Sequence, residues 1–484
     1  MRIIKVIFIL LLCHFGYGQK VTVADEINIR NYYAYDMMGN IGGNTLLYLD
    51  KGLEHYVNIY DSELKYKRNK ELRFEKRKVR VHYLVPKDST FNVVYSYKER
   101  DTIFYRINEY DHNAVFKDSV TIEKEVSNMI PKNYRHYTSD DKSKTVMFAQ
   151  DKGRLLYMRV IDNVNNEILW AADVELKKID TEDDFRKVIV TNEGIVIYLF
   201  EQNNSRYSRE DHWLTVLGLY QGSIILQSKI DMKDRVSCDT ELSFNNVTGN
   251  VVVAGLSSEK SKEDAKEYFF VNKHISAYDL IEVPVVKEIG LDFVREVYGR
   301  KKNKEKALKD FQIHSVMNRR DGGFLLIAEM DREYQRRTTF NSVNRGRSPR
   351  NNNSSSPLRG WTDYYNEDIV MFSIHPDGKE HWREVLFKKQ FSQDDGGIFS
   401  SFYLFKTPSR IKIIYNDEIK NNNTVSEYVL NPLGQYERNS LLSTEYQNLR
   451  LRFSAAIQLN NHQLLIPSEK SYNLRLVKID YSPI

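Results

Sequence analysis

The feature that most constrains the fold is a strand–turn–strand unit that recurs along the chain. Its clearest copy spans 155–178, where apolar residues alternate on both sides of a turn at Asn165 and Asn166. The residues that end corresponding strands lie 50, 51 and 49 residues apart in the pairs Asp61 and Asp111, Asp111 and Asp162, and Asn431 and Asp480. Because this period matches one four-stranded blade per unit, the sequence predicts an all-β fold, a single β-propeller.

Eight such units can be counted between 57 and 480. The unit at 269–286 is the weakest, so seven blades remain the alternative. The last unit ends without an outer strand, while a strand-like segment at 21–29 precedes the first unit. An N-terminal strand that completes the last blade would remove two free sheet edges. We therefore predict a closed ring of eight blades.

The first 18 residues have the pattern of a signal peptide rather than of a blade. Arg2 and Lys5 precede a short apolar run at 6–12, and small residues at 16 and 18 precede Gln19. That run is too short to span a bilayer, and no later segment is apolar enough to do so. We therefore expect an exported protein whose propeller domain is 19–484.

The charge of the mature chain bears on the class of partner, and its cysteine content bears on how the fold is stabilised. Cleavage would remove two positive residues and no acidic ones, lowering the formal charge from +5 to +3. Together with export, this small charge argues against nucleic acid. Cys238 would be the one cysteine left, so packing rather than disulfides must stabilise the fold.

Two insertions stretch the repeat, at 284–311 and 331–360. The second half of the first is predicted to be a short exposed helix. The second has no apolar period and is predicted to be a mobile basic loop. Its arginines are the candidate partner-binding residues Arg332, Arg336, Arg337, Arg345, Arg347, Arg350 and Arg359. They could bind anionic groups of a protein, a glycan or lipopolysaccharide.

The clearest unit also resembles the quinoprotein-like (PQQ-type) propeller repeat, in which a strand ends in Asp, the turn ends in Gly, and Trp follows four residues later. Asp162, Asn166 and Trp170 match this spacing with Asn in place of Gly, and Gly378 and Trp382 repeat it. The resemblance implies a tryptophan that fills the gap between blades, and a non-catalytic periplasmic scaffold. Redox quinoproteins carry a vicinal cysteine pair, which this chain lacks.

No residue is predicted to be catalytic, to bind a cofactor or to hold a metal. His375, Asp377 and His381 surround a hairpin turn, but further ligands cannot be placed. The nucleophile elbow, the HExxH helix and the phosphate-binding loop do not occur in the sequence. Cys238 is expected to be a small core residue.

We therefore expect a non-enzymatic scaffold for protein–protein interactions in the bacterial cell envelope. It would be periplasmic, associated with the outer membrane or extracellular, and its partners would be envelope or outer-membrane proteins. The alternatives are a glycan-binding or carbohydrate-active propeller enzyme and, third, a redox or sensor propeller. Acids, histidines or aromatic rings at the channel mouth would favour the glycan alternative, whereas Ser, Asn and aliphatic residues would favour the scaffold.

Overall fold

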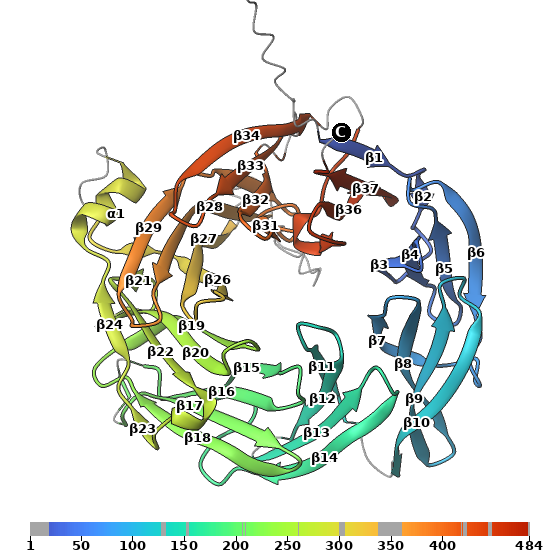
Figure 1. Cartoon of the computed structure of the whole chain (residues 1–484), viewed down its shortest axis with the longest axis horizontal. Helices are drawn as coiled ribbons and strands as arrows, with labels where there is room; N and C mark the ends of the chain where they lie inside the picture. Colours follow the sequence, from blue (N-terminus) through green and yellow to red (C-terminus); the bar gives the residue numbers. More distant parts are fainter. Residues whose placement is uncertain are drawn as a thin grey trace, which may run out of the picture.

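The computed structural model describes residues 19–126, 132–151, 154–205, 207–208, 210–259, 261–299, 305–336, 361–417, 419, 424–443 and 448–482. Over these residues the strands form eight blades arranged in a ring (Figure 1). The predicted eight-bladed propeller is confirmed, and the weak unit at 269–286 is a blade of its own. In blades 1 to 7 the first strand in the chain lies nearest the ring axis, whereas in blade 8 the N-terminal strand β1 (Lys20–Val23) lies on the outside (Figure 1).

Each blade is built on four antiparallel strands, and three blades carry a short fifth strand. In blade 4 this is β23 (Ile281–Glu282), which pairs in parallel with the outer strand, and blades 6 and 8 gain β30 (Gln390–Gln393) and β2 (Ile27–Asn28). Blades 1 and 2 are β3 (Ala34–Ile41), β4 (Asn44–Asp50), β5 (His55–Tyr60), β6 (Tyr66–Leu72), and β7 (Arg80–Pro86), β8 (Thr90–Glu99), β9 (Thr102–Asp111), β10 (Phe116–Val126). Blades 3 and 4 are β11 (Arg135–Thr138), β12 (Lys144–Gln150), β13 (Leu155–Asp162), β14 (Glu167–Glu175), and β15 (Phe185–Val190), β16 (Val196–Gln202), β17 (Trp213–Tyr220), β18 (Ser223–Asp231). Blades 5 and 6 are β19 (Val236–Asn245), β20 (Asn250–Ser258), β22 (Glu267–His274), β24 (Val285–Glu288), and β26 (Phe311–Asn318), β27 (Phe324–Arg336), β28 (Trp361–Ile374), β29 (Glu380–Leu386). Blades 7 and 8 are β31 (Phe402–Lys406), β32 (Ile411–Asn416), β33 (Thr424–Leu430), β34 (Tyr436–Ser443), and β35 (Ile457–Gln458), β36 (Gln463–Lys470), β37 (Asn473–Asp480), β1 (Lys20–Val23).

The N-terminal strand closes the ring, as the sequence predicts. β1 pairs antiparallel with β37, with Val21 opposite Ile479, and β2 (Ile27–Asn28) pairs with the start of the same strand (Figure 1). The Ala24 amide extends the ladder by donating to the Leu476 carbonyl at 2.8 Å. The otherwise free edge of β37 is therefore covered by a segment from the other end of the chain.

The apolar core is divided among the junctions between blades. Each of the eight junctions has its own cluster of buried side chains. Strands in the middle of a blade are covered on both sides, so β16 is buried over six of its seven residues. At the junction of blades 8 and 1, Leu47 packs with Leu465 and Leu476, which makes closure a packing contact as well as a strand pairing.

A helix and a small sheet lie between blades 5 and 6. Helix α1 (Leu291–Tyr298) buries Phe293, Val294 and Val297 in the core of that junction, and β21 (Asp264–Ala265) pairs with β25 (Leu308–Lys309). This helix occupies the first half of the 284–311 insertion. The exposed helix predicted for its second half is not found in the part that the structure describes. Residues 305–311 contain β25 instead of a helix, and 300–304 lie outside the described residues. None of the helices that the structure describes is long and apolar enough to span a bilayer.

The antiparallel order of each blade separates two faces of the ring. We call the face that carries the turns between first and second strands, and between third and fourth strands, the turn face. The other, the connection face, carries the remaining connections, so β27 ends there at Arg336 and β28 begins there at Trp361. The segment that joins β24 to β26 leaves and re-enters the blades on the same face, so the described ends of both insertions lie on the connection face.

Candidate functional site

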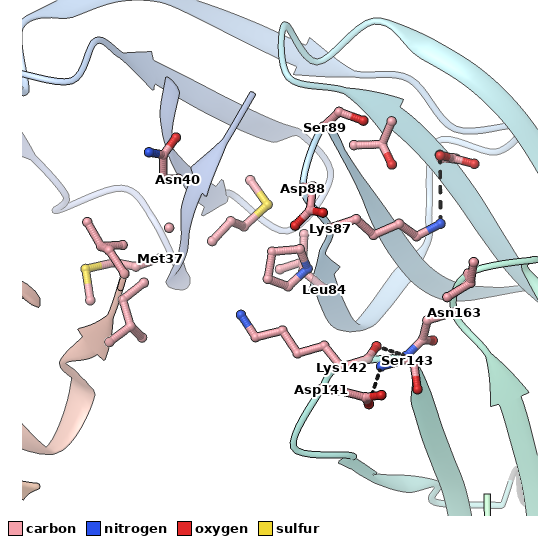
Figure 2. A pocket seen from close by; sticks show the side chains of 18 of the residues that line it. Met37, Asn40, Leu84, Lys87, Asp88, Ser89, Asp141, Lys142, Ser143 and Asn163 are labelled. Carbon is pink, nitrogen blue, oxygen red and sulfur yellow. Dashed lines mark hydrogen bonds and ion pairs between the residues drawn. The ribbon is translucent and has the colours of Figure 1, made fainter. Parts of the chain in front are cut away.

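A cavity of about 790 Å³ opens on the turn face beside the central channel (Figure 2). Its walls come from four adjacent blades, namely the inner strand of blade 1, the first turns of blades 2 and 3, and β35 of blade 8. Residues 36–40, 87–90, 141–143 and 457–459 contribute to it. Because these segments are brought together only when blade 8 meets blade 1, the cavity depends on closure of the ring.

A glycine bulge shapes the wall formed by blade 1. The pairing of β3 with β4 shifts register between Met37 and Gly39, and Gly39 has a φ of +83°. A Cβ at this position would lie 3.3 Å from Cδ2 of Leu459 on blade 8, so glycine allows both the bend and the close approach. Asp36 lines the same wall, and the surrounding blades raise the pKa of its carboxyl by limiting its hydration.

Asn166 links blades 2 and 3 beneath the cavity. Its side-chain oxygen accepts hydrogen bonds from Lys87 Nζ at 2.9 Å and Asn92 Nδ2 at 2.6 Å. Its own Nδ2 donates to Glu109 Oε2 at 2.8 Å. Burial lowers the pKa of the Lys87 amine, while Glu109, 3.8 Å away, acts in the opposite direction. We call these four residues the Asn166 clamp.

The clamp also explains why this turn ends in asparagine, where the PQQ-type repeat has glycine. Asn166 has a φ of +59°, a backbone conformation that asparagine tolerates better than most residues. The turn is held by Asp162, whose Oδ1 accepts the Val164 amide at 2.8 Å. Asparagine therefore combines the left-handed turn with a side chain that reaches the neighbouring blade, which glycine could not do.

Charged side chains of both signs extend from the turns into the cavity. Figure 2 shows the Lys142 side chain extending into the cavity, with Asp88 on another part of the wall. Neither side chain forms a hydrogen bond or ion pair with another residue that the structure describes. The Lys142 turn is itself well ordered by hydrogen bonds, because Asp141 Oδ1 accepts the Ser139 hydroxyl at 2.7 Å and the Ser143 amide at 2.9 Å. The cavity thus presents available charges on a hydrogen-bonded frame.

The residues that line the cavity combine features expected of a glycan site with features expected of a protein-binding scaffold. Asp36, Asp88, Glu109 and Asp141 supply the acids expected of a glycan site. Serine, asparagine and aliphatic side chains make up much of the remainder, as expected of a scaffold. No histidine or aromatic ring occurs among the described residues that line it, so the wall offers no stacking surface for a sugar.

The first six residues of the predicted basic loop form a strand, which corrects the expectation of a loop there. Residues 331–336 continue β27 and pair with 361–366, and β30 (Gln390–Gln393) adds a further strand to this arm. The guanidinium of Arg332 lies over the Tyr365 ring at 5.0 Å. The remaining predicted arginines, apart from Arg336 at the end of the strand, lie outside the described residues, namely Arg337, Arg345, Arg347, Arg350 and Arg359.

A buried ion pair anchors the root of this arm. Lys388 Nζ lies 2.5 Å from Glu329 Oε1, and the lysine side chain is fully buried. The same amine donates to the Asn366 carbonyl at 2.9 Å and to Gln390 Oε1 at 2.7 Å. The arm therefore rises from a fixed base on the connection face, away from the turn-face cavity.

The other candidate groups are not assembled into a reactive site. The His375 and His381 rings lie 4.4 Å apart, while Asp377 pairs with Lys379. Among the described residues, no three metal-binding side chains gather as a ligand set. Burial raises the pKa of the Cys238 thiol to about 12, so it is protonated at neutral pH.

Sequence reasoning missed the cavity residues. A weak signal was present, because the first turns of blades 2 and 3 carry similar short motifs, Lys87-Asp88-Ser89 and Asp141-Lys142-Ser143. Each combines a lysine, an aspartate and a serine at a strand end. Only the ring geometry shows that both motifs face one cavity.

Comparison with known proteins finds distant structural similarities only. No family model matches this chain, and no curated protein sequence does. Similar solved structures include the Dos1 propeller, at 9% identity and a TM-score of 0.44 over 96% of both chains. The polysaccharide lyase Uly1 is 8% identical with a TM-score of 0.41 over 95% of this chain and 100% of that one. The β-propeller domain of the Trilobed protease from Pyrococcus furiosus is 10% identical with a TM-score of 0.37 over 87% and 98%.

The PQQ-type repeat class is not confirmed by any family match. The packing role that the resemblance implies is nevertheless present in the structure. Trp170 is buried in the cluster between blades 3 and 4, and its Nε1 donates to the Gly194 carbonyl of blade 4 at 2.9 Å. The tryptophan thus fills the gap between neighbouring blades.

Proposed function

We propose that this protein is an exported, non-enzymatic β-propeller that serves as a scaffold for protein–protein interactions in the bacterial cell envelope. The observation that carries the proposal is the turn-face cavity, where Lys142 and Asp88 extend from a hydrogen-bonded frame. A site that is ordered before binding loses less conformational entropy when a partner arrives. A rigid ring that presents such charges is suited to binding rather than to large rearrangement.

A protein segment with charges of both signs is the ligand that this cavity fits best. Lys142 would pair with a carboxylate of the partner, and Asp88 with a lysine or arginine. The serine and asparagine side chains of the wall can exchange hydrogen bonds with peptide groups. Binding of this kind depends on charge complementarity and weakens as salt screens it.

Export and the envelope location belong to the proposal, since residues 1–18 lie outside the described part of the chain. Their signal-like pattern and the single remaining cysteine support this location. The basic segment 331–360 would supply a second contact on the connection face. Its arginines would bind an acidic surface of an envelope protein, or an anionic glycan or lipopolysaccharide.

The alternative function is a glycan-binding or carbohydrate-active propeller. The four carboxylates that line the cavity favour it. One of them is Asp36, whose pKa is raised by limited hydration, which is the direction that a general acid needs. The lack of an aromatic surface in the described lining argues for the scaffold instead.

The test is crosslinking in the native envelope followed by recovery of the tagged protein. The informative variant is Lys142→Ala with Asp88→Ala, and the matched control is Lys70→Ala with Glu71→Ala on the exposed face of β6. We expect wild type and control to recover the same protein partner, and the cavity variant to lose it. Equal recovery from all three proteins would contradict the cavity assignment, and retention on a polysaccharide with no protein partner would support the alternative.

A further inference from the structure

A second cavity, of about 430 Å³, lies on the turn face between blades 6 and 7. It shares no lining residue with the first cavity, and blades 6 and 7 lie across the ring from blades 2 and 3 (Figure 1). Its walls are the first turns of both blades, the start of β29, and the turn between β33 and β34. We call it the blade 6–7 pocket. Its volume lies in the range of sites that take small ligands or a few side chains.

Trp382 gives this pocket an apolar wall. The indole Nε1 already donates to the Pro432 carbonyl at 3.0 Å, so its polar group is satisfied. Gly434 has a φ of +86°, and a Cβ there would lie 2.7 Å from the indole ring. Glycine therefore lets the ring lie against the turn. Leu433 is 63% exposed beside it, and Met317, Leu325, Ile411 and Leu430 extend the apolar lining.

The rim of the pocket is basic. Arg319 is held in place, since its guanidinium donates to Asp321 at 2.5 Å and to the Ser373 hydroxyl at 2.9 Å. Arg320 and Arg410 are exposed, and neither forms an ion pair with a residue that the structure describes. Because Asp321 is already engaged by Arg319, two arginine charges at the rim are available to a ligand.

We infer that the blade 6–7 pocket binds an acidic peptide segment that carries one large apolar side chain. The apolar side chain would lie against Trp382 and Leu433, where burial of its surface is favourable. Flanking carboxylates would pair with Arg320 and Arg410 through charge-assisted hydrogen bonds. A peptide of this kind would contact both the apolar wall and the basic rim. An anionic polysaccharide would pair with the arginines of the rim but would leave the apolar wall without a contact.

The inference goes beyond the proposed function because it assigns a second site with its own ligand chemistry. Titration calorimetry on the purified protein tests it. The probe is a capped nonapeptide with a central phenylalanine flanked by glutamates. The comparison peptides replace every glutamate by glutamine, or the phenylalanine by glycine. Dextran sulfate serves as the anionic polysaccharide.

Two double variants distinguish binding in the blade 6–7 pocket from nonspecific electrostatic attraction between the acidic peptide and the protein. Arg320→Ser with Arg410→Ser removes the free rim charges, while Arg30→Ser with Arg77→Ser removes two exposed arginines far from the pocket. We expect the first pair to weaken binding of the acidic peptide about fivefold to tenfold and the second to leave it nearly unchanged. Leu433→Ser should weaken the same peptide severalfold, since its exposed side chain contributes to the wall without supporting the core.

Several results would overturn the inference. One is no binding of the acidic phenylalanine peptide to the wild-type protein. Another is binding of the glutamine peptide with the same affinity, which would remove the role of the rim. Equal losses in the two arginine double variants, or tighter binding of dextran sulfate that is insensitive to Leu433→Ser, would also reject the peptide site.

Discussion

Replacing Asn166 by glycine tests whether the clamp between blades 2 and 3 stabilises the ring. The substitution keeps the left-handed turn, because glycine adopts positive φ without strain. It removes the acceptor of Lys87 and Asn92 and the donor to Glu109. Asn92 is fully buried, and its amide would keep only the Asn163 carbonyl at 3.3 Å.

The expected magnitude follows from these contacts. A net hydrogen bond between neutral groups contributes about 1 kcal/mol, and one to a charged group about 1.5 kcal/mol or more. Glycine also removes the strain of the left-handed conformation, which raises the free energy of unfolding by about 1 kcal/mol at most because asparagine tolerates that conformation. We therefore expect Asn166→Gly to lower the free energy of unfolding by about 3 kcal/mol.

Urea unfolding followed by tryptophan fluorescence measures this change, with Trp170 as a reporter in the strand that follows the turn. Gln221→Gly is the matched control, since Gln221 also has a positive φ, +49°, in an exposed turn of blade 4. Its side chain holds no neighbouring blade, so the control should be unchanged or slightly more stable. Equal stability of Asn166→Gly and wild type would refute the clamp.

Two further predictions concern buried charges. Burial alone raises the pKa of Glu201, but hydrogen bonds from His212 and Arg186 bring it down to about 2. Since this lies below the ordinary value of 4.5, the carboxylate stabilises the fold above pH 4.5, and about 3 kcal/mol is lost as the pH falls from 4.5 towards 2. Glu201→Gln should flatten that part of the acid unfolding profile, and an unchanged profile would contradict the assignment. Glu329→Gln, which leaves Lys388 buried without its ionic partner, should cost about 3 to 5 kcal/mol in urea unfolding, and Glu329→Leu with Lys388→Met should restore most of it.

The repeat could be predicted because its signals are local. A turn residue at the end of an alternating strand marks each blade, and the missing outer strand after Asp480 points to the segment at 21–29. The arm at 331–336 shows the limit of such reasoning. Its charged sequence reads as a loop, yet pairing with 361–366 and with β30 makes it a strand.

The candidate sites could not be predicted because they arise between blades. Lys87 and Lys142 lie in turns of different blades, and no period in the sequence shows that both reach one cavity. The side chain of Asn166 matches a turn signal, but its contact with Glu109 depends on the spacing of two sheets. Trp382 was recognised by its spacing, whereas the pocket beside it required the position of blade 7.

The most direct test of the scaffold proposal is photo-crosslinking in intact cells, with a benzoylphenylalanine in place of Lys142 in the cavity. The control carries the same group in place of Lys70 on the outer rim. The account predicts a discrete covalent adduct with one envelope protein at position 142 and none at position 70. Absence of a protein adduct at position 142, or the same adducts at both positions, would contradict it.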